Sequence, residues 1–273
     1  MIEHFEKFNK GDKSLLPLSF SQLSEFAFQR ERWALKRLFG FEFPSSPAME
    51  RGKAVESGLN YWLTAHSFKE AKEKMYAEYD DNCADLVNPK IEDERANLEP
   101  LLCEGIQRLK DHAFQWSLLD YQKKIELEIQ GVPVIGYTDF HFEDNKTKED
   151  FFIDLKTTLR KPNGISNSHA MQQSIYHKAT NSSQKLWYLV NKKSGAEFYE
   201  FGLADYKRPM RICEHIIKVM INYLKKVDNL DEVKNSLIPN PDDWIWKEEE
   251  VYKARKKVWG VLITPNLIRC IGL

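Results

Sequence analysis

The chain has 273 residues, of which 42% are hydrophobic and 30% are charged. This length fits one large domain or two small ones, and the composition excludes disordered and collagen-like chains. The 40 Lys and Arg residues nearly balance the 41 Asp and Glu residues, so the net charge is -1. A strongly basic nucleic-acid-binding domain is therefore excluded, and an anionic partner would have to bind a local basic patch.

Membrane spans, signal peptides and sulfur-based metal sites are not expected. No apolar run approaches the roughly 18 residues of a membrane span, and residues 1–13 lack the apolar core of a signal peptide. The cysteines form no Cys-x-x-Cys pair, which favours reduced, buried thiols over a metal site; they are Cys83, Cys103, Cys213 and Cys270. We expect a cytoplasmic protein that does not contact a membrane.

The first part of the chain is predicted to be helical. Its apolar residues recur every three or four positions, as they do along one face of an α-helix. Gly40 and nearby proline residues interrupt the pattern, as expected at helix ends. We expect helices over residues 21–39, 48–66, 67–86 and 91–119.

Near residue 121 the hydrophobic pattern changes to strict alternation, which is typical of strands. Three consecutive strands are predicted as an antiparallel meander, over residues 125–129, 132–143 and 151–158. A helix over 168–180 would cross the sheet to two further strands, at 185–190 and 197–201. Two more helices are expected over 209–227 and 246–258.

The third predicted strand carries a pair of opposite charges. In Phe152-Ile153-Asp154-Leu155-Lys156-Thr157 the side chains alternate between the two faces. Asp154 and Lys156 therefore share one face, about 6.6 Å apart along the strand. An isolated Asp-x-Lys also fits an ordinary amphipathic strand with a solvated polar side.

A second carboxylate is predicted to lie beside this pair. Asp139 occurs within Gly136-Tyr137-Thr138-Asp139-Phe140, and a tight meander would bring it next to Asp154. Two adjacent carboxylates repel each other unless a cation lies between them. Mg²⁺ takes carboxylate oxygens and can activate water for phosphodiester hydrolysis, with a lysine orienting that water. Taken alone, Asp139 also fits a solvated residue at a strand end.

The order of these residues resembles the PD-(D/E)XK nucleases, in particular the RecB-type and lambda-exonuclease-like branch. Asp139 followed by Asp154-Leu155-Lys156 is similar to the core motif of that family. The branch also has a Gln-x-x-x-Tyr helix, to which Gln172 and Tyr176 correspond. The resemblance implies that these two side chains contact substrate phosphates or support the lysine. As a helix pair they also fit simple packing of the tyrosine.

The resemblance extends to the predicted helices at the start of the chain. The branch opens with Leu-Ser-x-Ser-x-Leu, here residues 18–23, in which Ser19 or Ser21 is expected to be a helix N-cap. A following Gly-x-x-x-His supplies a metal ligand in many members, but here the segment from Gly52 ends in Glu56. The resemblance implies Glu56 as a ligand in place of histidine. An exposed helical glutamate is the alternative.

The resemblance implies a metal site but no iron–sulfur cluster. The expected ligands of Mg²⁺ or Mn²⁺ are Glu56, Asp139, Asp154 and the Leu155 carbonyl, and Lys156 would position the attacking water. Many relatives bind a cluster through four cysteines. In this chain Gln29 stands at the first of those positions, and no cysteine occurs between Pro239 and Trp259. The tail is expected to be held instead by packing of Trp244, Trp246 and Trp259.

The fold expected from these observations is α/β, with a restriction-endonuclease-like central mixed sheet flanked by helices and a helical N-terminal elaboration. Residues 1–273 are expected to form one nuclease domain, divided into a helical part (18–120), a catalytic core (121–204) and C-terminal helices with a tail (205–273).

The expected function is metal-dependent DNA cleavage by Glu56, Asp139, Asp154 and Lys156. Substrate-binding residues are expected to be Gln172, Tyr176, Arg160 and Lys161. An exonuclease acting on duplex ends or single strands in recombination, repair or phage DNA metabolism is favoured, in a bacterial cell or a phage-infected host. An endonuclease or end-trimming nuclease, and a catalytically silent DNA- or protein-binding member, are the alternatives. A homo-oligomer and a recombination partner protein are both left open.

Overall fold

The computed structural model describes residues 2–9, 14–237 and 249–260. The chain forms two compact units. The larger consists of residues 44–126 and 136–210, and the smaller of residues 1–43, 127–135 and 211–273. Each unit is described by itself. The single domain that we expect over 1–273 stays a prediction.

Four helices form one layer of the larger unit: α4 (Pro47–Ala65), α5 (Phe68–Cys83), α6 (Ile91–Arg95) and α7 (Leu98–Asp111). The helix starts are visible in the sequence. Ser46 accepts a hydrogen bond from the Met49 N–H ahead of Pro47 in the first turn, and Ser67 accepts one from the Glu70 N–H. Where α4 and α7 cross, a Cβ on Gly105 would lie 2.8 Å from Leu59 Cδ2, so this close approach requires glycine.

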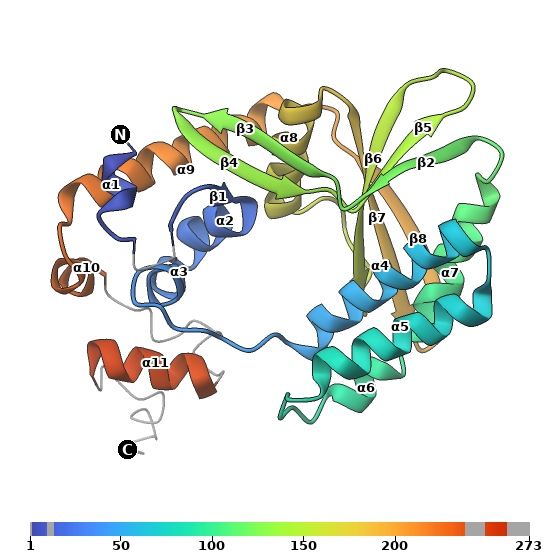
Figure 1. Ribbon diagram of the computed structural model, residues 1–273, viewed down its shortest axis with the longest axis horizontal. Coiled ribbons are helices and arrows are strands. Elements are labelled where there is room, and N and C mark those ends of the chain that lie inside the picture. Colours follow the sequence, from blue (N-terminus) through green and yellow to red (C-terminus); the bar gives the residue numbers. More distant parts are fainter. Residues whose placement is uncertain (1, 10–13, 238–248, 261–273) are drawn as a thin grey trace, which may run out of the picture. The chain divides into compact units, whose positions relative to one another are not determined.

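A five-stranded sheet forms the second layer, in the order β2-β5-β6-β7-β8 (Figure 1). The strands are β2 (Trp116–Tyr121), β5 (Phe140–Asp144), β6 (Asp150–Thr158), β7 (Ser183–Lys192) and β8 (Gly195–Gly202). Strands β6 and β7 are parallel, and the other neighbours are antiparallel. Helix α8 (Asn167–Thr180) connects the parallel pair, as expected for a crossover.

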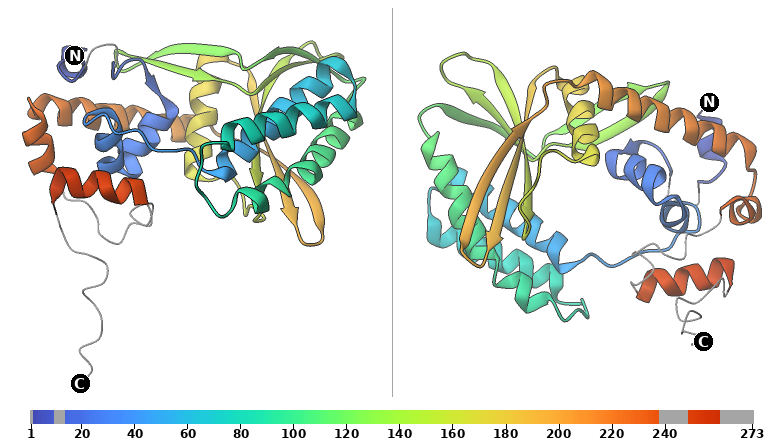
Figure 2. Two further views of the ribbon diagram at one scale, coloured as in Figure 1. Left: turned by 60° about the horizontal axis from the view of Figure 1, so that its bottom comes forward. Right: turned by 180° about the vertical axis from the view of Figure 1, so that it is seen from behind.

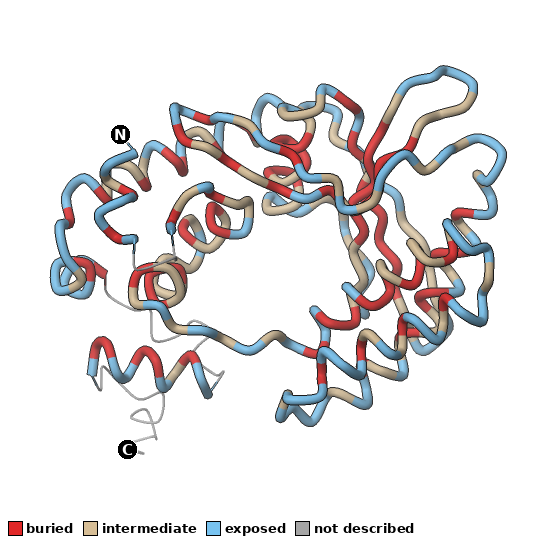
Figure 3. Tube along the Cα trace, in the orientation of Figure 1, coloured by how far each residue is buried: buried red, intermediate tan, exposed pale blue. Residues whose placement is uncertain are grey.

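The two faces of this sheet have different neighbours. Phe151, Ile153 and Leu155 of β6 join Trp187 and Leu189 of β7 in one hydrophobic cluster with α4, α5 and α7. The views in Figure 2 show those helices on one side of the sheet and α8 on the other, and Figure 3 shows buried residues along β6, β7 and the inner side of α4. The even-numbered residues of β6, Asp154 and Lys156 among them, therefore face away from the helical cluster.

Strand β6 is flanked by strands along only part of its length. Its pairing with β5 runs from Asp150 to Ile153 and ends there. Its pairing with β7 continues to Thr158. Residues 154–158 consequently have a strand neighbour on the β7 side alone.

The smaller unit contains a short three-stranded sheet and several helices. The sheet has the order β1-β4-β3, with β1 (Leu18–Ser19), β4 (Val132–Tyr137) and β3 (Lys124–Ile129). The helices are α1 (Glu3–Glu6), α2 (Phe20–Phe28), α3 (Arg30–Arg37), α9 (Lys207–Lys226), α10 (Leu230–Ser236) and α11 (Glu249–Trp259). The boundary between the units falls within β3, β4 and α9.

Three sequence expectations concern this smaller unit. Ser19 is the N-cap of α2 and accepts a hydrogen bond from the Gln22 N–H at 3.3 Å, which confirms that expectation. Trp259 is buried and packs against Phe39 with ring centroids 6.0 Å apart. Trp244 and Trp246 lie outside the described residues.

Several boundaries predicted from the sequence are wrong. The helix expected over 21–39 is two helices, α2 and α3. The helix expected over 91–119 is α6 and α7, the latter ending at Asp111, and Trp116–Tyr121 is a strand. Phe114 and Leu119, the large apolar side chains near the end of that predicted helix, are exposed. The single strand expected over 132–143 is two strands, β4 and β5, which belong to different sheets. The expected meander is therefore split, with Thr138 and Asp139 between the two strands.

The fold class is as predicted, because mixed sheets flanked by helices make up an α/β structure consistent with a restriction-endonuclease-like fold. Within the described ranges, no helix has the length and apolar character needed to cross a bilayer. Cys83 and Cys213 are buried, but Cys103 is exposed, contrary to the expectation of uniformly buried thiols. Cys270 lies outside the described residues.

Candidate active site

The predicted charged pair lies on β6 as expected from its alternation. Lys156 Nζ is 2.6 Å from Asp154 Oδ2, and the Asp154 side chain is only 3% exposed. The other oxygen, Oδ1, is buried and accepts no hydrogen bond from any described residue. Burying a carboxylate oxygen without a partner is unfavourable. This oxygen is therefore suited to bind a cation.

Asp139 lies beside this pair, although it is not in a strand. Its Oδ2 accepts a hydrogen bond from the Leu155 N–H at 2.7 Å, so it contacts the backbone between Asp154 and Lys156. Burial raises the pKa of Asp139 well above its usual value, and the negative charges of Asp154 and Glu56 raise it further. Lys156 and the Leu155 N–H oppose these effects. The structure thus brings the two predicted aspartates together.

Glu56 approaches the same site from helix α4. Its Oε1 accepts a hydrogen bond from Gln122 Nε2 at 3.1 Å, and that amide is also 3.1 Å from Tyr121 Oη. Burial raises the pKa of Glu56, whereas the bonds from Gln122 and Tyr121 lower it. The positive charge of Lys156 lowers the pKa of Glu56, and the negative charge of Asp154 raises it.

Burial and the attraction of neighbouring carboxylates have opposite effects on the pKa of Lys156. Burial opposes the charge of Lys156, but the carboxylates of Asp154 and Asp139 outweigh it and raise the pKa of the ammonium group. Lys156 therefore remains protonated at neutral pH. In this form it donates hydrogen bonds and cannot act as a base.

The three carboxylates do not form a ready-made metal site in the arrangement described. Within residues 2–9, 14–237 and 249–260, no three His, Cys, Asp or Glu side chains are grouped closely enough to hold an ion. Asp154 is turned toward Lys156, and Asp139 toward the backbone of Leu155. The donor set still fits a hard divalent cation, because it offers carboxylate oxygens, one of them buried and unpartnered. The metal site stays a prediction.

Gln172 and Tyr176 support the bend that carries Asp139. Gln172 Nε2 donates to Tyr176 Oη at 3.0 Å, and Tyr176 Oη donates to the carbonyl oxygen of Tyr137 at 2.8 Å. A Cβ on Gly136 would lie 2.8 Å from Tyr176 Cε1, so the ring packs directly over that glycine. These contacts reach the backbone next to Asp139 and not Lys156, so support of the lysine, one of the two roles that the resemblance implies, stays a prediction. Phosphate binding stays a prediction.

His169 and Tyr188 join the site although sequence reasoning missed them. His169 Nδ1 lies 2.6 Å from Tyr188 Oη, and Tyr188 is the β7 partner of Lys156 in the parallel register. Burial, and then the charge of Lys156, lower the pKa of His169. The one available signal was that His169 precedes Gln172 by three residues on the same helix. Tyr188 lies within an apolar strand, where nothing distinguishes it.

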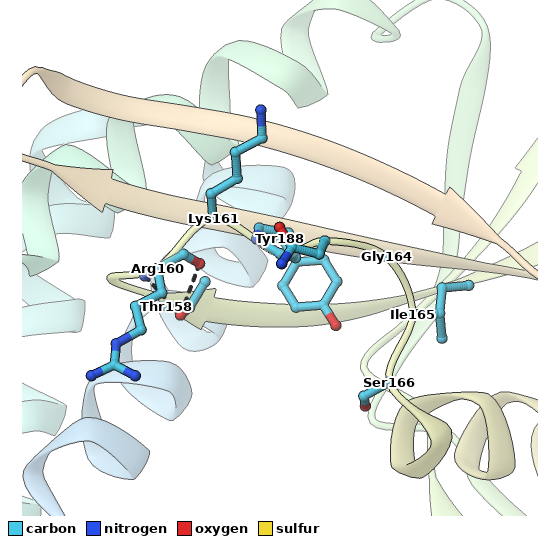
Figure 4. A pocket seen from close by; sticks show the side chains of 9 residues that line it. Thr158, Arg160, Lys161, Gly164, Ile165, Ser166 and Tyr188 are labelled. Carbon is cyan, nitrogen blue, oxygen red and sulfur yellow. Dashed lines mark hydrogen bonds between the residues drawn. The ribbon is translucent and has the colours of Figure 1, made fainter.

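Arg160 and Lys161 lie on the loop after β6 and are both exposed. They line an open pocket of about 470 Å³ together with Tyr188 and Ser166. Figure 4 shows the two basic side chains extending to different sides of the loop. Lys161 Nζ is 5.1 Å from the centroid of the Tyr199 ring, whereas Arg160 has no ion pair with any described residue.

Comparison with known proteins identifies a likeness of fold. No family model matches the chain, and no curated protein matches it. A crystal structure of a protein from Eubacterium rectale that carries the name "Putative exonuclease" is similar, with a TM-score of 0.54 and 13% sequence identity, over 88% of this chain and 97% of the other. A structure of the protein SSO0001 has a TM-score of 0.31 and 17% identity, over 72% of this chain and 86% of the other. At this identity, the first likeness concerns the fold alone.

Proposed function

We propose that the protein is a metal-dependent deoxyribonuclease of the PD-(D/E)XK type. The observation that carries the proposal is the geometry around β6. Asp154 and Lys156 project from one face of the strand, and Asp139 binds the backbone N–H of Leu155 between them. The fold likeness to a chain named as an exonuclease supports the same class of activity.

Asp139, Asp154 and Glu56 would hold Mg²⁺ or Mn²⁺, with the Leu155 carbonyl as a further ligand. Such an ion, when bound, lowers the pKa of a coordinated water and neutralises charge on the phosphate under attack. The buried, unpartnered Oδ1 of Asp154 is the best-placed ligand among these groups. An iron–sulfur cluster has no part in this proposal.

Lys156 would orient the attacking water. Its ammonium group is held by Asp154 at 2.6 Å, and its side chain remains 25% exposed. It therefore reaches solvent on the face of the sheet where substrate would arrive. A fixed donor at this position stabilises negative charge as it develops in the transition state.

DNA is the proposed partner, bound through its backbone. Arg160 and Lys161 lie two and three residues beyond the end of β6, and long basic side chains are common ligands of phosphate oxygens. Arg160 is available for this role because no described carboxylate pairs with it. Gln172 and Tyr176 would act by holding the Asp139 bend and by contacting the strand. Degradation from duplex ends or single strands, in recombination, repair or phage DNA metabolism, is the favoured role.

The test is cleavage of linear duplex, single-stranded and circular DNA with Mg²⁺ or Mn²⁺. Asp154→Ala and Lys156→Ala should abolish cleavage, and Lys178→Ala, which changes an exposed lysine of α8, should not. Equal rates for all four proteins would overturn the proposal. Degradation of linear but not circular DNA indicates an exonuclease, and cleavage of circles an endonuclease.

A silent DNA-binding protein is the second candidate, favoured by the glutamate at position 56 where many relatives have histidine. Titration with Mn²⁺ in a calorimeter separates the two, because a silent protein has no need of a divalent ion. Saturable binding of Mn²⁺ that Asp154→Ala removes would exclude that candidate.

A further inference from the structure

The part of β6 that carries Asp154 and Lys156 is an edge strand on one side. Pairing with β5 ends at Ile153, so the backbone groups of residues 154–158 on that side have no neighbouring strand. Backbone N–H and C=O groups that lose water must find other partners. In this segment, side chains from elsewhere in the fold bond two of these groups, the Leu155 N–H and the Thr157 carbonyl.

Two side chains occupy the place of the missing strand. Asp139 Oδ2 accepts from the Leu155 N–H at 2.7 Å. Arg51 Nη2 donates to the Thr157 carbonyl oxygen at 3.1 Å, and Arg51 Nε donates to Thr157 Oγ1 at 3.3 Å. The backbone on both sides of Lys156 is thereby held.

Arg51 is fixed by its own surroundings. Its third nitrogen, Nη1, forms an ion pair with Glu94 of α6, and both residues are buried, with 4% and 8% of their surfaces exposed. A guanidinium group presents several donors in one rigid plane, so it can bind a carboxylate and a backbone carbonyl at the same time. A lysine offers one nitrogen and cannot reproduce this geometry.

Arg51 also connects β6 to the helix that carries Glu56. It lies in the second turn of α4, five residues before Glu56. A Cβ on Gly52 would lie 3.4 Å from Thr157 Oγ1, so α4 passes close to the end of β6 at this point. The contact between Arg51 and Thr157 therefore joins the end of β6 to the turn of α4 that precedes Glu56.

We propose that Arg51 is a positioning residue, which replaces the missing strand at the end of β6 and so sets the directions of Asp154 and Lys156 relative to Glu56. The catalytic consequence of this role rests on the proposed nuclease function. The structural consequence, a backbone held at Thr157, does not depend on it.

The main experiment separates positioning from stability with a double variant. In Arg51→Met/Glu94→Met both buried charges are replaced together, which commonly preserves stability because no charge is left unpaired. We expect a Tm near that of the parent, a kcat for DNA cleavage reduced about tenfold or more, and a KM within about twofold. Amide hydrogen exchange at Leu155, whose N–H donates to Asp139, should be about tenfold faster because the end of β6 is less firmly held, whereas the amide of Ile153 should be unchanged. Parent-like kcat and exchange would overturn the proposal.

A single variant covers the case in which the double variant does not fold. Arg51→Lys retains the charge opposite Glu94 but cannot bind Glu94 and the Thr157 carbonyl together. We expect it to fold, with the same faster exchange at Leu155 and a lower kcat. Unchanged exchange at Leu155 in folded Arg51→Lys would contradict the role.

The matched control is Asp80→Met/Arg95→Met, which removes another arginine–carboxylate pair of the same layer. Arg95 Nε and Nη2 donate to the two oxygens of Asp80, each at 2.7 Å, and neither residue bonds to β6. This control should leave kcat and the exchange of the Leu155 amide unchanged. If the control lowers both as much as the Arg51 variants do, the effect is not specific to Arg51.

The two proposals fail in different ways. If the parent does not cleave DNA with any divalent ion, the nuclease proposal fails, and the exchange data still decide the role of Arg51. If the parent cleaves DNA and Asp154→Ala does not, but Arg51→Lys changes neither rate nor exchange, only the positioning role is lost.

Discussion

The two halves of β6 are held by different means. Residues 150–153 lie between two strands, β5 and β7, and follow the ordinary ladder of a sheet. Residues 154–158 have β7 on one side and, on the other, the side chains of Asp139 and Arg51. The half that carries the proposed chemistry is thus the half without a second strand.

This difference shows how a functional segment is exposed without losing its order. A strand paired on both sides would cover its edge, leaving no room for a substrate or ion. An unpaired edge would leave backbone groups without partners. Single side chains bond two of those groups while occupying less space than a strand, and one of these side chains, Asp139, also belongs to the proposed site.

The largest expected effect is that of Asp154→Asn, in the half held by side chains. The substitution preserves shape but removes the negative charge next to Lys156. We expect kcat for DNA cleavage to fall by about 10²–10³, the range observed when one strong electrostatic contact to a transition state is lost. Circular dichroism should show an unchanged fold. Parent-like cleavage by this variant would remove β6 from the proposed active site.

Asp139→Asn is expected to separate activity from stability. The amide oxygen can still accept from the Leu155 N–H, but the charge is lost. Burial and the neighbouring acids raise the pKa of Asp139 in the folded protein. Between the unfolded pKa of about 3.9 and this raised pKa, the folded protein therefore holds a proton on Asp139 that the unfolded chain has lost. The unfolding free energy of the parent thus decreases as the pH rises through this range.

The measurement is Tm against pH for parent and Asp139→Asn. The variant should have the higher Tm at pH 8, because it buries no charge at position 139. The expected difference is about 2–4 °C for each kcal/mol by which this raises the free energy of unfolding, and it should vanish near pH 4. DNA cleavage should be lost at every pH. A variant that is less stable than the parent at pH 8 would show that the charge of Asp139 is already compensated.

Gly136→Ala tests the support of the Asp139 bend. The added Cβ would lie 2.8 Å from a carbon of the Tyr176 ring, so the ring or the strand must shift. Overpacking of this kind costs about 1–3 kcal/mol. We expect a lower Tm in thermal unfolding and slower cleavage. Gly202→Ala at the end of β8 is the control, because a Cβ there would lie 3.7 Å from the Gln184 carbonyl oxygen, an ordinary contact, and should leave Tm and cleavage unchanged.

The smallest effect is expected for Asp150→Asn, in the half flanked by two strands. Asp150 binds His141 Nε2 at 2.7 Å and Ser182 Oγ at 2.8 Å. Burial raises the pKa of Asp150, but the bonds from His141 and Ser182 outweigh it, so that the pKa is lowered. Its stabilising contribution is then present above the unfolded pKa of about 3.9 and lost as the pH falls through the folded pKa.

The side chain of Asp150 is 44% exposed, so solvent screening limits the loss to less than about 1 kcal/mol at pH 7. Thermal unfolding should show this small loss at pH 7 and none near pH 2, and cleavage of DNA should be unaffected. A large loss of cleavage would mean that the two halves of β6 are not functionally distinct.

The sequence by itself determined the features that depend on a short stretch of backbone. Alternation along a strand places Asp154 and Lys156 on one face, and a spacing of four places Gln172 near Tyr176 on one side of a helix. Ser19 caps α2 for a similarly local reason. Each of these relations is fixed by the repeat of a regular element, so neighbouring residues are sufficient to predict it.

Only the tertiary structure decided where strands end and what replaces them. The separation of β4 from β5, the pairing of His169 with Tyr188 and the contact of Arg51 with Thr157 across 106 residues have no local signal. The Arg51 contact depends on which backbone groups remain unpaired once the sheet has formed, and the pairing of His169 with Tyr188 depends on how α8 packs against β7. Which backbone N–H and C=O groups lack a partner is known only once the sheet has assembled. No single stretch of the sequence therefore specifies these contacts.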